Sequence, residues 1–247
     1  MPNQTRAILT GHTRGLGAAL AELLLAQGAD VLALSRTRND ALAARYPGKL
    51  HEVELDLADS VKLAEWLSGE ALSGFVSGAA HVLLVNNAGL LAPVGSLADQ
   101  APAAVARAVS VNVAAPLMLA AAVVQAASQA PDTRIVHISS GAARNAYPGW
   151  SIYCATKAAL DHHARAAMLD GNRGLRICSV APGVVDTDMQ AEIRGTDPGR
   201  FPMRERFDAL KREGQLATPG QSASKVIEYL LSDAFGDTPT IDVRDLT

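Results

Sequence analysis

Short apolar runs alternate along the chain with longer segments that are rich in alanine and leucine. The apolar runs predict strands at Ala7–Leu9, Val31–Ser35, Leu50–Leu55, His81–Val85, Arg134–Ile138, Leu175–Val180 and Thr240–Val243. Several of these runs are almost continuously apolar, which is typical of parallel strands covered on both faces. The segments between them predict helices at Gly15–Gln27, Asp40–Arg45, Asp59–Ser68, Ala103–Gln129, Ser151–Asp170 and Gln221–Ser232.

This alternation predicts an α/β fold built from βαβ units with right-handed crossovers. We expect a single Rossmann-type, doubly wound parallel sheet of about seven strands with helices on both faces. No repeat, low-complexity segment or linker divides the chain, so residues 1–247 are expected to form one domain.

One stretch, residues 186–219, interrupts the alternation. It is rich in charged residues, glycine and proline, and it lies between a predicted strand and the last predicted helix. A strandless connection of this length is unusual in a compact domain, so we expect a lid over a substrate site. The alternative is a disordered insertion, which the apolar residues Met189, Ile193, Phe201 and Phe207 make the weaker interpretation.

Composition narrows the class of protein further. Apolar residues make up 49% of the chain and charged residues 19%, which favours a globular protein over a disordered one. The net charge is −3 and no basic stripe is present, so no nucleic-acid partner is expected.

Cysteines and apolar segments bear on the compartment. Cys154 and Cys178 have no metal or redox spacing, so no disulfide framework is expected and a reducing compartment fits. The adjacent His162 and His163 cannot face one metal ion from one side of a helix, and no metal site is expected. The first residues lack the apolar core of a signal peptide. The longest uninterrupted apolar stretch, Val113–Val124, is too short to span a bilayer. We therefore expect a cytoplasmic protein with no membrane partner.

A glycine-rich turn, Thr10–Gly17, joins the first predicted strand to the first helix. Glycines there let the backbone approach a pyrophosphate closely, and the helix N-terminus offers free N–H groups to it. Such a turn also serves simply to cap a helix, so its place after the first strand carries the argument. Asp56-Leu57 and Asn86-Asn87-Ala88-Gly89 follow the third and fourth strands, at the sheet edge where ligands gather. Asn-Asn-Ala-Gly is alternatively a plain turn.

The end of the second predicted strand indicates which dinucleotide binds. NAD sites usually place a carboxylate there, whereas this strand ends in Ser35-Arg36. Arg14 in the glycine-rich turn supplies a second guanidinium, and two planar forks suit a ribose 2′-phosphate. NADPH/NADP⁺ is therefore the expected cofactor, the alternative being two solvated surface arginines. The cofactor-binding residues predicted so far are Gly11, Thr13, Arg14, Gly15, Leu16, Gly17, Ser35, Arg36, Asp56, Leu57, Asn87, Ala88 and Gly89.

Tyr153 and Lys157 stand four positions apart in a predicted helix, so both project from one face. A nearby ammonium favours the phenolate, and we expect Lys157 to lower the pKa of Tyr153. Such a pair is common by chance on helices. Ser140 ends the fifth strand and offers a hydroxyl to a carbonyl oxygen. Asn112 stands in an Ala/Val context, which suggests a buried hydrogen-bonding role.

Together these motifs, with Pro182-Gly183-x-x-x-Thr187, resemble the short-chain dehydrogenase/reductase family over nearly the whole chain. The resemblance implies that Tyr153 is the general acid, that Lys157 lowers its pKa and binds the nicotinamide ribose, and that Ser140 positions the carbonyl. It implies a proton-relay water at Asn112 and a homodimer or homotetramer. It also adds Tyr153, Lys157, Pro182, Gly183, Val185 and Thr187 to the cofactor site.

The segments Gly149–Lys157 and Ala181–Gln190 look like the sepiapterin reductase and benzil reductase branch of the family. That likeness implies reduction of vicinal dicarbonyls with NADPH. It places Asp242 near a carboxylate that anchors pterin substrates, the alternative being that Asp242 caps a surface turn. Trp150 and Met189 are the other substrate-contacting candidates, and Trp150 is either core or active-site wall.

The sequence thus predicts an NADPH-dependent reductase acting on a small-molecule ketone or vicinal dicarbonyl. One alternative is an NADP-binding sensor without turnover, and the complete Ser140, Tyr153 and Lys157 set counts against it. Another is an alcohol dehydrogenase working with NAD in the oxidative direction, and Ser35-Arg36 counts against that.

Overall fold

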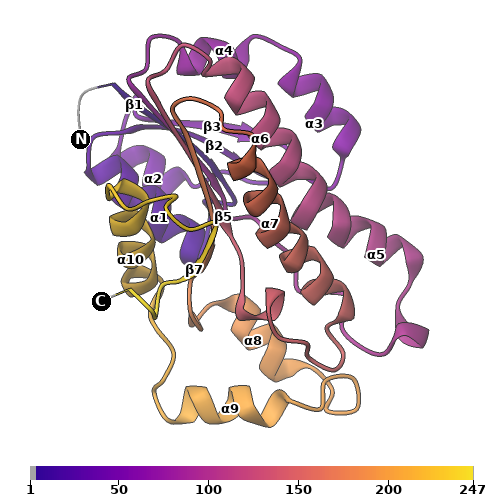
Figure 1. The fold of residues 1–247 in the computed structure, drawn as a ribbon. Coiled ribbons are helices and arrows are strands. Elements are labelled where there is room, and N and C mark those ends of the chain that lie inside the picture. The colour runs from indigo at the N-terminus through magenta and orange to yellow at the C-terminus, as the bar shows by residue number, and fades with distance from the viewer. Residues whose placement is uncertain (1–3, 247) are drawn as a thin grey trace.

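A seven-stranded parallel sheet runs through the computed structural model, which describes residues 4–246 (Figure 1). Its strands are β1 (Thr5–Thr10), β2 (Asp30–Ser35), β3 (Leu50–Glu54), β4 (His81–Asn86), β5 (Asp132–Ile138), β6 (Leu175–Ala181) and β7 (Thr240–Asp242). Their order is β3-β2-β1-β4-β5-β6-β7, so the direction of winding reverses between β1 and β4. The expected doubly wound α/β fold is confirmed.

Helices cover both faces of the sheet. One face carries α1 (Gly15–Ala26), α2 (Asp40–Arg45) and α10 (Pro219–Leu231). The other carries α3 (Ser60–Leu67), α4 (Ala71–Val76), α6 (Ala115–Ala126), which continues α5 (Pro102–Val109), and α7 (Ser151–Leu169). Because side chains alternate along a strand, neighbours such as Ile8 and Leu9 enter opposite cores.

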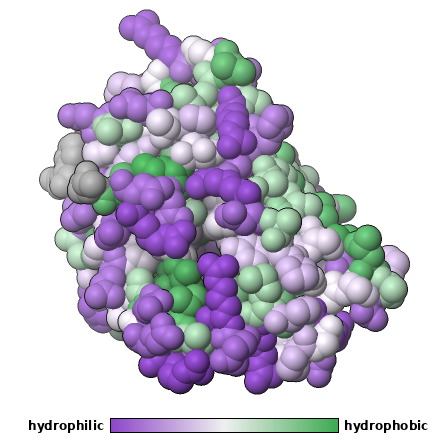
Figure 2. Space-filling view, turned by 60° about the horizontal axis from the view of Figure 1, so that its bottom comes forward, coloured by the Kyte–Doolittle hydropathy of each residue, from purple (hydrophilic) through white to green (hydrophobic). Residues whose placement is uncertain are grey.

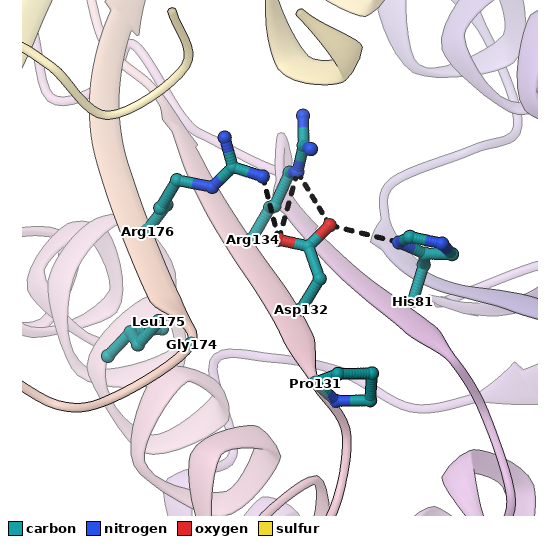
Figure 3. A pocket seen from close by; sticks show the side chains of 7 residues that line it. All are labelled: His81, Pro131, Asp132, Arg134, Gly174, Leu175 and Arg176. Carbon is teal, nitrogen blue, oxygen red and sulfur yellow. Dashed lines mark hydrogen bonds and ion pairs between the residues drawn. The ribbon is translucent and has the colours of Figure 1, made fainter. Parts of the chain in front are cut away.

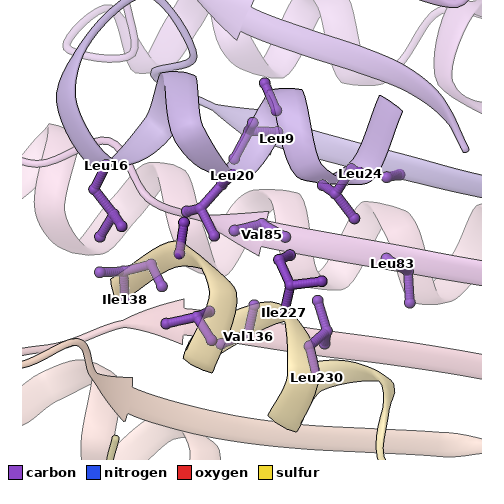
Figure 4. Close-up of a cluster of buried hydrophobic side chains, with 14 of the residues drawn as sticks. Leu9, Leu16, Leu20, Leu24, Leu83, Val85, Val136, Ile138, Ile227 and Leu230 are labelled. Carbon is purple, nitrogen blue, oxygen red and sulfur yellow. The ribbon is translucent and has the colours of Figure 1, made fainter. Parts of the chain in front are cut away.

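The core beneath α1 and α10 shows how tightly these layers meet. Leu20 and Leu24 of α1, Val85 of β4 and Leu230 of α10 are completely shielded from solvent (Figure 4). Truncating one such leucine to alanine typically costs about 2–5 kcal/mol of stability. This packing fixes α1, and therefore the glycine-rich turn that precedes it, against the sheet.

The helix expected at Ala103–Gln129 is broken by a π-helical turn at Ser110–Ala114, between α5 and α6. The helical run Pro102–Ala126 has 25 residues and contains an 18-residue window with a mean hydropathy of 1.8, so by length and composition it is able to cross a membrane. This run is longer than Val113–Val124, the uninterrupted apolar stretch that the sequence analysis judged too short to span a bilayer. However, Leu119 and Val123 are fully buried against the sheet, which marks it as a core helix.

Residues 186–219 fold into two helices, α8 (Asp188–Gly195) and α9 (Arg204–Arg212), and not into a disordered insertion. They lie beyond the carboxyl ends of the strands, at the bottom of Figure 1. Phe201, between the two helices, stacks on Trp150 with ring centres 4.5 Å apart and planes 3° from parallel. The segment is therefore anchored beside α7.

Candidate active site

A cavity of about 740 Å³ opens at the carboxyl edge of the sheet, between the glycine-rich turn, the start of α7 and segment 186–219. Figure 2 looks toward this end of the molecule, where the surface is hollowed between hydrophilic and hydrophobic side chains. All the residues predicted to contact cofactor or substrate line this cavity, as do Ser140, Tyr153 and Lys157. Asn112 alone among the predicted site residues does not line it; it is buried.

The glycine-rich turn is held in a shape that only glycine allows. A Cβ on Gly17 would lie 1.9 Å from the carbonyl oxygen of Gly11, and Gly15 has φ +55°. The Asn87 amide donates to the carbonyls of Thr10 and Gly11, at 2.9 and 3.1 Å. Among the described residues, no side chain caps the N-terminus of α1, which begins at Gly15, so its first N–H groups are available to an anion.

The two arginines expected at a 2′-phosphate differ in their surroundings. Arg36 is exposed, and in the described part of the chain it forms no ion pair within 4 Å, although its charge contributes to lowering the pKa of Asp56. Arg14 donates to Asp188 at the start of α8, at 2.9 Å. The Ser35 hydroxyl is buried and donates to the carbonyl of Thr37. Arg36 is therefore the guanidinium that is free to bind a phosphate, while Arg14 is tied to segment 186–219.

Asp56 follows β3 and lines the same cavity. It accepts hydrogen bonds from the backbone N–H of Ala58 and from Arg107, which is 3.1 Å away. Burial alone would raise the pKa of Asp56, but these two donors and the charge of Arg107 hold it below its ordinary value. The carboxylate is therefore ionised, and Arg107 was not among the predicted site residues.

Tyr153, Lys157 and Ser140 meet where α7 begins beside the end of β5. The Lys157 ammonium donates to the carbonyl of Ile138 at 2.8 Å and lies 5.8 Å from the centre of the Tyr153 ring. Tyr153 is only 7% exposed and Lys157 only 4%. The Ser140 hydroxyl accepts from the N–H of Ala142, which fixes the turn after β5.

Burial raises the pKa of Tyr153 and lowers the pKa of Lys157. For Tyr153 this is the opposite of the direction expected from the sequence. Loss of solvent raises the pKa of Tyr153 to about 12, and a hydrogen bond with Ser140 only partly opposes this. Burial also lowers the pKa of Lys157 to about 8, although Asp161 favours its charged form. The pKa of Tyr153 is therefore raised and not lowered as expected, because desolvation is the largest contribution to it. The phenol holds its proton firmly.

Asn112 is buried and is hydrogen-bonded to α7, the helix that carries Tyr153 and Lys157. Its side-chain oxygen accepts from the N–H of Leu90 and its amide donates to the carbonyl of Leu90, both at 2.8 Å. The amide also donates to Thr156 of α7 at 3.1 Å. Because Asn112 sits in the π turn, that irregularity aims its side chain at the segment following Gly89. A buried hydrogen-bonding role is what the sequence suggested.

Aromatic and charged residues form the opposite end of the cavity. Trp150 lines it and packs against Tyr153 and Phe207, so it is both core and wall. Asp242 lines it as well, but both carboxylate oxygens accept from Arg244, at 2.9 and 2.6 Å. The backbone N–H of Arg244 also donates to Asp242. This local contact is of the kind expected if Asp242 caps a surface turn.

Sequence reasoning missed several residues of the cavity wall, among them Tyr147, Arg206 and Arg244. Tyr147 precedes the Gly149–Lys157 motif and carries no pattern of its own. The two arginines stand in charged stretches, where nothing in the order of residues separates a cavity wall from a solvated surface.

A second pocket, of about 490 Å³, lies at the amino ends of β4, β5 and β6 (Figure 3). Asp132 accepts there from Arg134, Arg176 and His81. Arg134 also donates to the carbonyls of Leu230 and Ser232, so the cluster ties the end of α10 to the sheet. Ligands in open α/β sheets bind at the carboxyl edge, and we assign this pocket a structural role.

The motifs around the large cavity are matched by a family model. The model of the short chain dehydrogenases covers residues 5–198, from β1 into segment 186–219. The chain belongs to this family. Family membership makes it an NAD(P)-dependent oxidoreductase, and benzil reductases are among its relatives.

Those relatives cover almost the whole chain. A Bacillus cereus benzil reductase that forms (S)-benzoin is 33% identical over 95% of this chain and 98% of its own. A sepiapterin reductase of Meriones unguiculatus is 34% identical over 96% of this chain and 95% of its own. A short-chain dehydrogenase/reductase crystal structure from Burkholderia vietnamiensis is 55% identical over 100% of both chains, with a TM-score of 0.73. The short-chain dehydrogenase/reductase resemblance and its branch are confirmed.

Proposed function

We propose that this oxidoreductase reduces a ketone or vicinal dicarbonyl to the hydroxy compound with NADPH, and that Tyr153 is the general acid. The observation that carries the proposal is that half-buried Ser140 and buried Tyr153 and Lys157 meet in the cavity lined by the glycine-rich turn. The benzil and sepiapterin reductases among the relatives support the substrate class.

The cavity fits a dinucleotide phosphate. The uncapped N-terminus of α1 and the backbone around Gly15 suit the pyrophosphate. Arg36, which has no carboxylate partner within residues 4–246, suits a 2′-phosphate. Asp56, Ala88 and Gly89 line the same cavity as the N-terminus of α1, Arg36 and Tyr153. When bound, the cofactor supplies the hydride.

The residues of α7 and β5 supply the rest of the chemistry. The Ser140 hydroxyl and the Tyr153 hydroxyl hold the carbonyl oxygen of the substrate. Tyr153, protonated because burial raises its pKa to about 12, gives its proton to that oxygen as negative charge develops there. The Lys157 ammonium, 5.8 Å from the centre of the Tyr153 ring, would stabilise the phenolate left behind and would hold the ribose of a bound cofactor. Trp150 and Phe207 exclude water from this end of the cavity.

A substrate screen tests the proposal. Purified protein with NADPH is offered benzil, a sepiapterin-like diketone and a simple aryl ketone, and loss of NADPH absorbance is followed. Turnover of at least one carbonyl compound is expected, together with slower or absent turnover when NADH replaces NADPH. Tight NADP⁺ binding without turnover of any carbonyl compound or alcohol would favour the sensor, and activity only with NAD⁺ and an alcohol would favour the oxidative enzyme.

A further inference from the structure

The charged side chains that line the cavity are mostly paired with one another. Three carboxylates line it, and each has a guanidinium partner: Asp188 with Arg14, Asp56 with Arg107, and Asp242 with Arg244. Two cavity guanidiniums, those of Arg36 and Arg206, form no ion pair within 4 Å in residues 4–246, although the charge of Arg36 does act on Asp56. Arg36 is at the cofactor end, and the proposed function gives it the 2′-phosphate. Arg206 remains without a role.

Arg206 differs from the other basic residues of its helix, α9. Arg204 pairs with Asp208 at 3.2 Å, Arg212 pairs with Glu205 at 3.3 Å, and Lys211 pairs with Asp186. In the described part of the chain, no such contact or side-chain hydrogen bond satisfies Arg206. Every basic side chain of α9 except Arg206, which lines the cavity, is thus paired with a carboxylate.

The position of Arg206 on α9 places it at the substrate end. Leu210, one turn further along the same face, lines the cavity too. The neighbouring Phe207 packs on Trp150 with ring centres 5.4 Å apart, and Trp150 in turn contacts Tyr153. Arg206 therefore extends the wall that begins at the general acid, on the side away from the glycine-rich turn.

We propose that the substrate of this enzyme is a carbonyl compound that carries a carboxylate, and that Arg206 binds this carboxylate. The inference rests on the proposed function and names its substrate class. A guanidinium binds a carboxylate through two parallel N–H donors, which gives both affinity and orientation. Asp242 does not offer a competing free carboxylate to a cationic or amino-bearing substrate, because Arg244 already occupies both of its oxygens.

Paired ligands that differ only in charge test this assignment. Binding of 4-carboxybenzil and of its methyl ester to the enzyme–NADP⁺ complex is measured by calorimetry, so that no turnover is required. Because Arg206 is exposed to water, the native protein is expected to bind the acid about tenfold more tightly than the ester. The preference should vanish in Arg206→Gln. It should persist in Arg212→Gln, a control that removes a paired arginine from the same helix.

Equal binding of acid and ester by the native protein would overturn the proposal, as would a preference that survives in Arg206→Gln. Unchanged NADP⁺ affinity and an unchanged unfolding midpoint show that this variant is folded. Reduction of benzil by NADPH, measured on the same native preparation, reports on the proposed function separately. If the acid is preferred but no diketone is reduced, the proposed function fails while the carboxylate site stands.

Discussion

At the scale of single residues, burial sets the pKa values of Tyr153 and Lys157, whereas hydrogen bonds and arginine charges outweigh burial at Asp56 and Asp242. Tyr153 is protonated well beyond neutral pH, whereas Lys157 loses its proton near pH 8. A general acid must carry its proton when the reaction begins, so the raised pKa of Tyr153 suits reduction. The lysine, and not the tyrosine, is then the group of this pair that titrates in the working range.

This assignment predicts the pH profile. Below pH 8 Lys157 is an ammonium, and above it the amine is neutral and no longer stabilises a phenolate. The kcat/KM for NADPH, which reports the ligand-free protein, should therefore fall as pH rises through about 8. In Lys157→Arg the fall should be absent up to pH 10, whatever the residual rate, because a guanidinium keeps its charge. A fall at the same pH in both proteins would assign the titration to another group.

Arg36 yields a prediction about cofactor choice. Its guanidinium lines the cavity without a carboxylate partner, so its loss should remove a charged hydrogen bond to the 2′-phosphate. Because the residue is exposed, we expect Arg36→Ala to weaken NADPH binding by about 1.5 kcal/mol, roughly tenfold, and to leave NADH binding nearly unchanged. Fluorescence titration with both cofactors checks this. Arg45→Ala, which removes an arginine paired with Glu22 outside the cavity, is the matched control. Equal losses for the two cofactors would contradict it.

The sequence was sufficient to predict which residues line the site, but it did not reveal their hydrogen-bond and ion-pair partners. Ser140, Tyr153 and Lys157 were found because their spacing and their place after predicted strands are visible in one dimension. The pairing of Arg14 with Asp188, or of Asp242 with Arg244, depends on how loops fold back across the cavity. The same is true of Arg206, whose isolation is evident only once the partners of its neighbours are known.

At the scale of elements, all predicted strands form, because buried parallel strands are nearly continuous apolar runs with little ambiguity. Helix α2 has the predicted bounds, Asp40–Arg45. Helix α4 was missed, since Ser73-Gly74 interrupts its short apolar pattern. The π turn at Asn112 was missed as well, because it depends on the side chain bonding to Leu90 and not on helix propensity.

Segment 186–219 was expected to be a lid, and its packing suggests how it is held. Phe201 is fully buried on Trp150, although it does not line the cavity. Phe201→Ala should loosen α8 and α9, raise the KM for the carbonyl substrate several-fold and expose the segment to limited proteolysis. NADPH affinity should change less than the KM, since α1 packs on the sheet core and the Arg14–Asp188 ion pair between the turn and the segment is exposed.

A conservative replacement makes this test specific. Phe201→Leu keeps most of the buried apolar surface and should fall between the native protein and Phe201→Ala in both measurements. Native-like protease resistance of segment 186–219 in Phe201→Ala would show that the stack on Trp150 does not hold the segment.

At the scale of the whole molecule, the fold brings motifs that are far apart in the sequence together at one edge of the sheet. The reversal between β1 and β4 brings the glycine-rich turn beside Asn86–Gly89, and β5 and α7 add Ser140, Tyr153 and Lys157 to that edge. Segment 186–219 and the end of β7 close the far side of the cavity. The proposed cofactor and proton-donor residues thus lie at one end of the cavity, and Arg206 and Asp242 lie at the other.

The most direct test of the account is Tyr153→Phe, measured for both NADPH affinity and single-turnover reduction of a diketone. The ring still packs on Trp150, so the fold and the cofactor site should be retained and the dissociation constant of NADPH should stay within about twofold of the native value. Hydride transfer to the diketone should fall by at least about a hundredfold, because the lost hydroxyl acts in the transition state. A variant that binds NADPH normally and still reduces the diketone at a rate close to that of the native protein would contradict the central claim that Tyr153 is the proton donor.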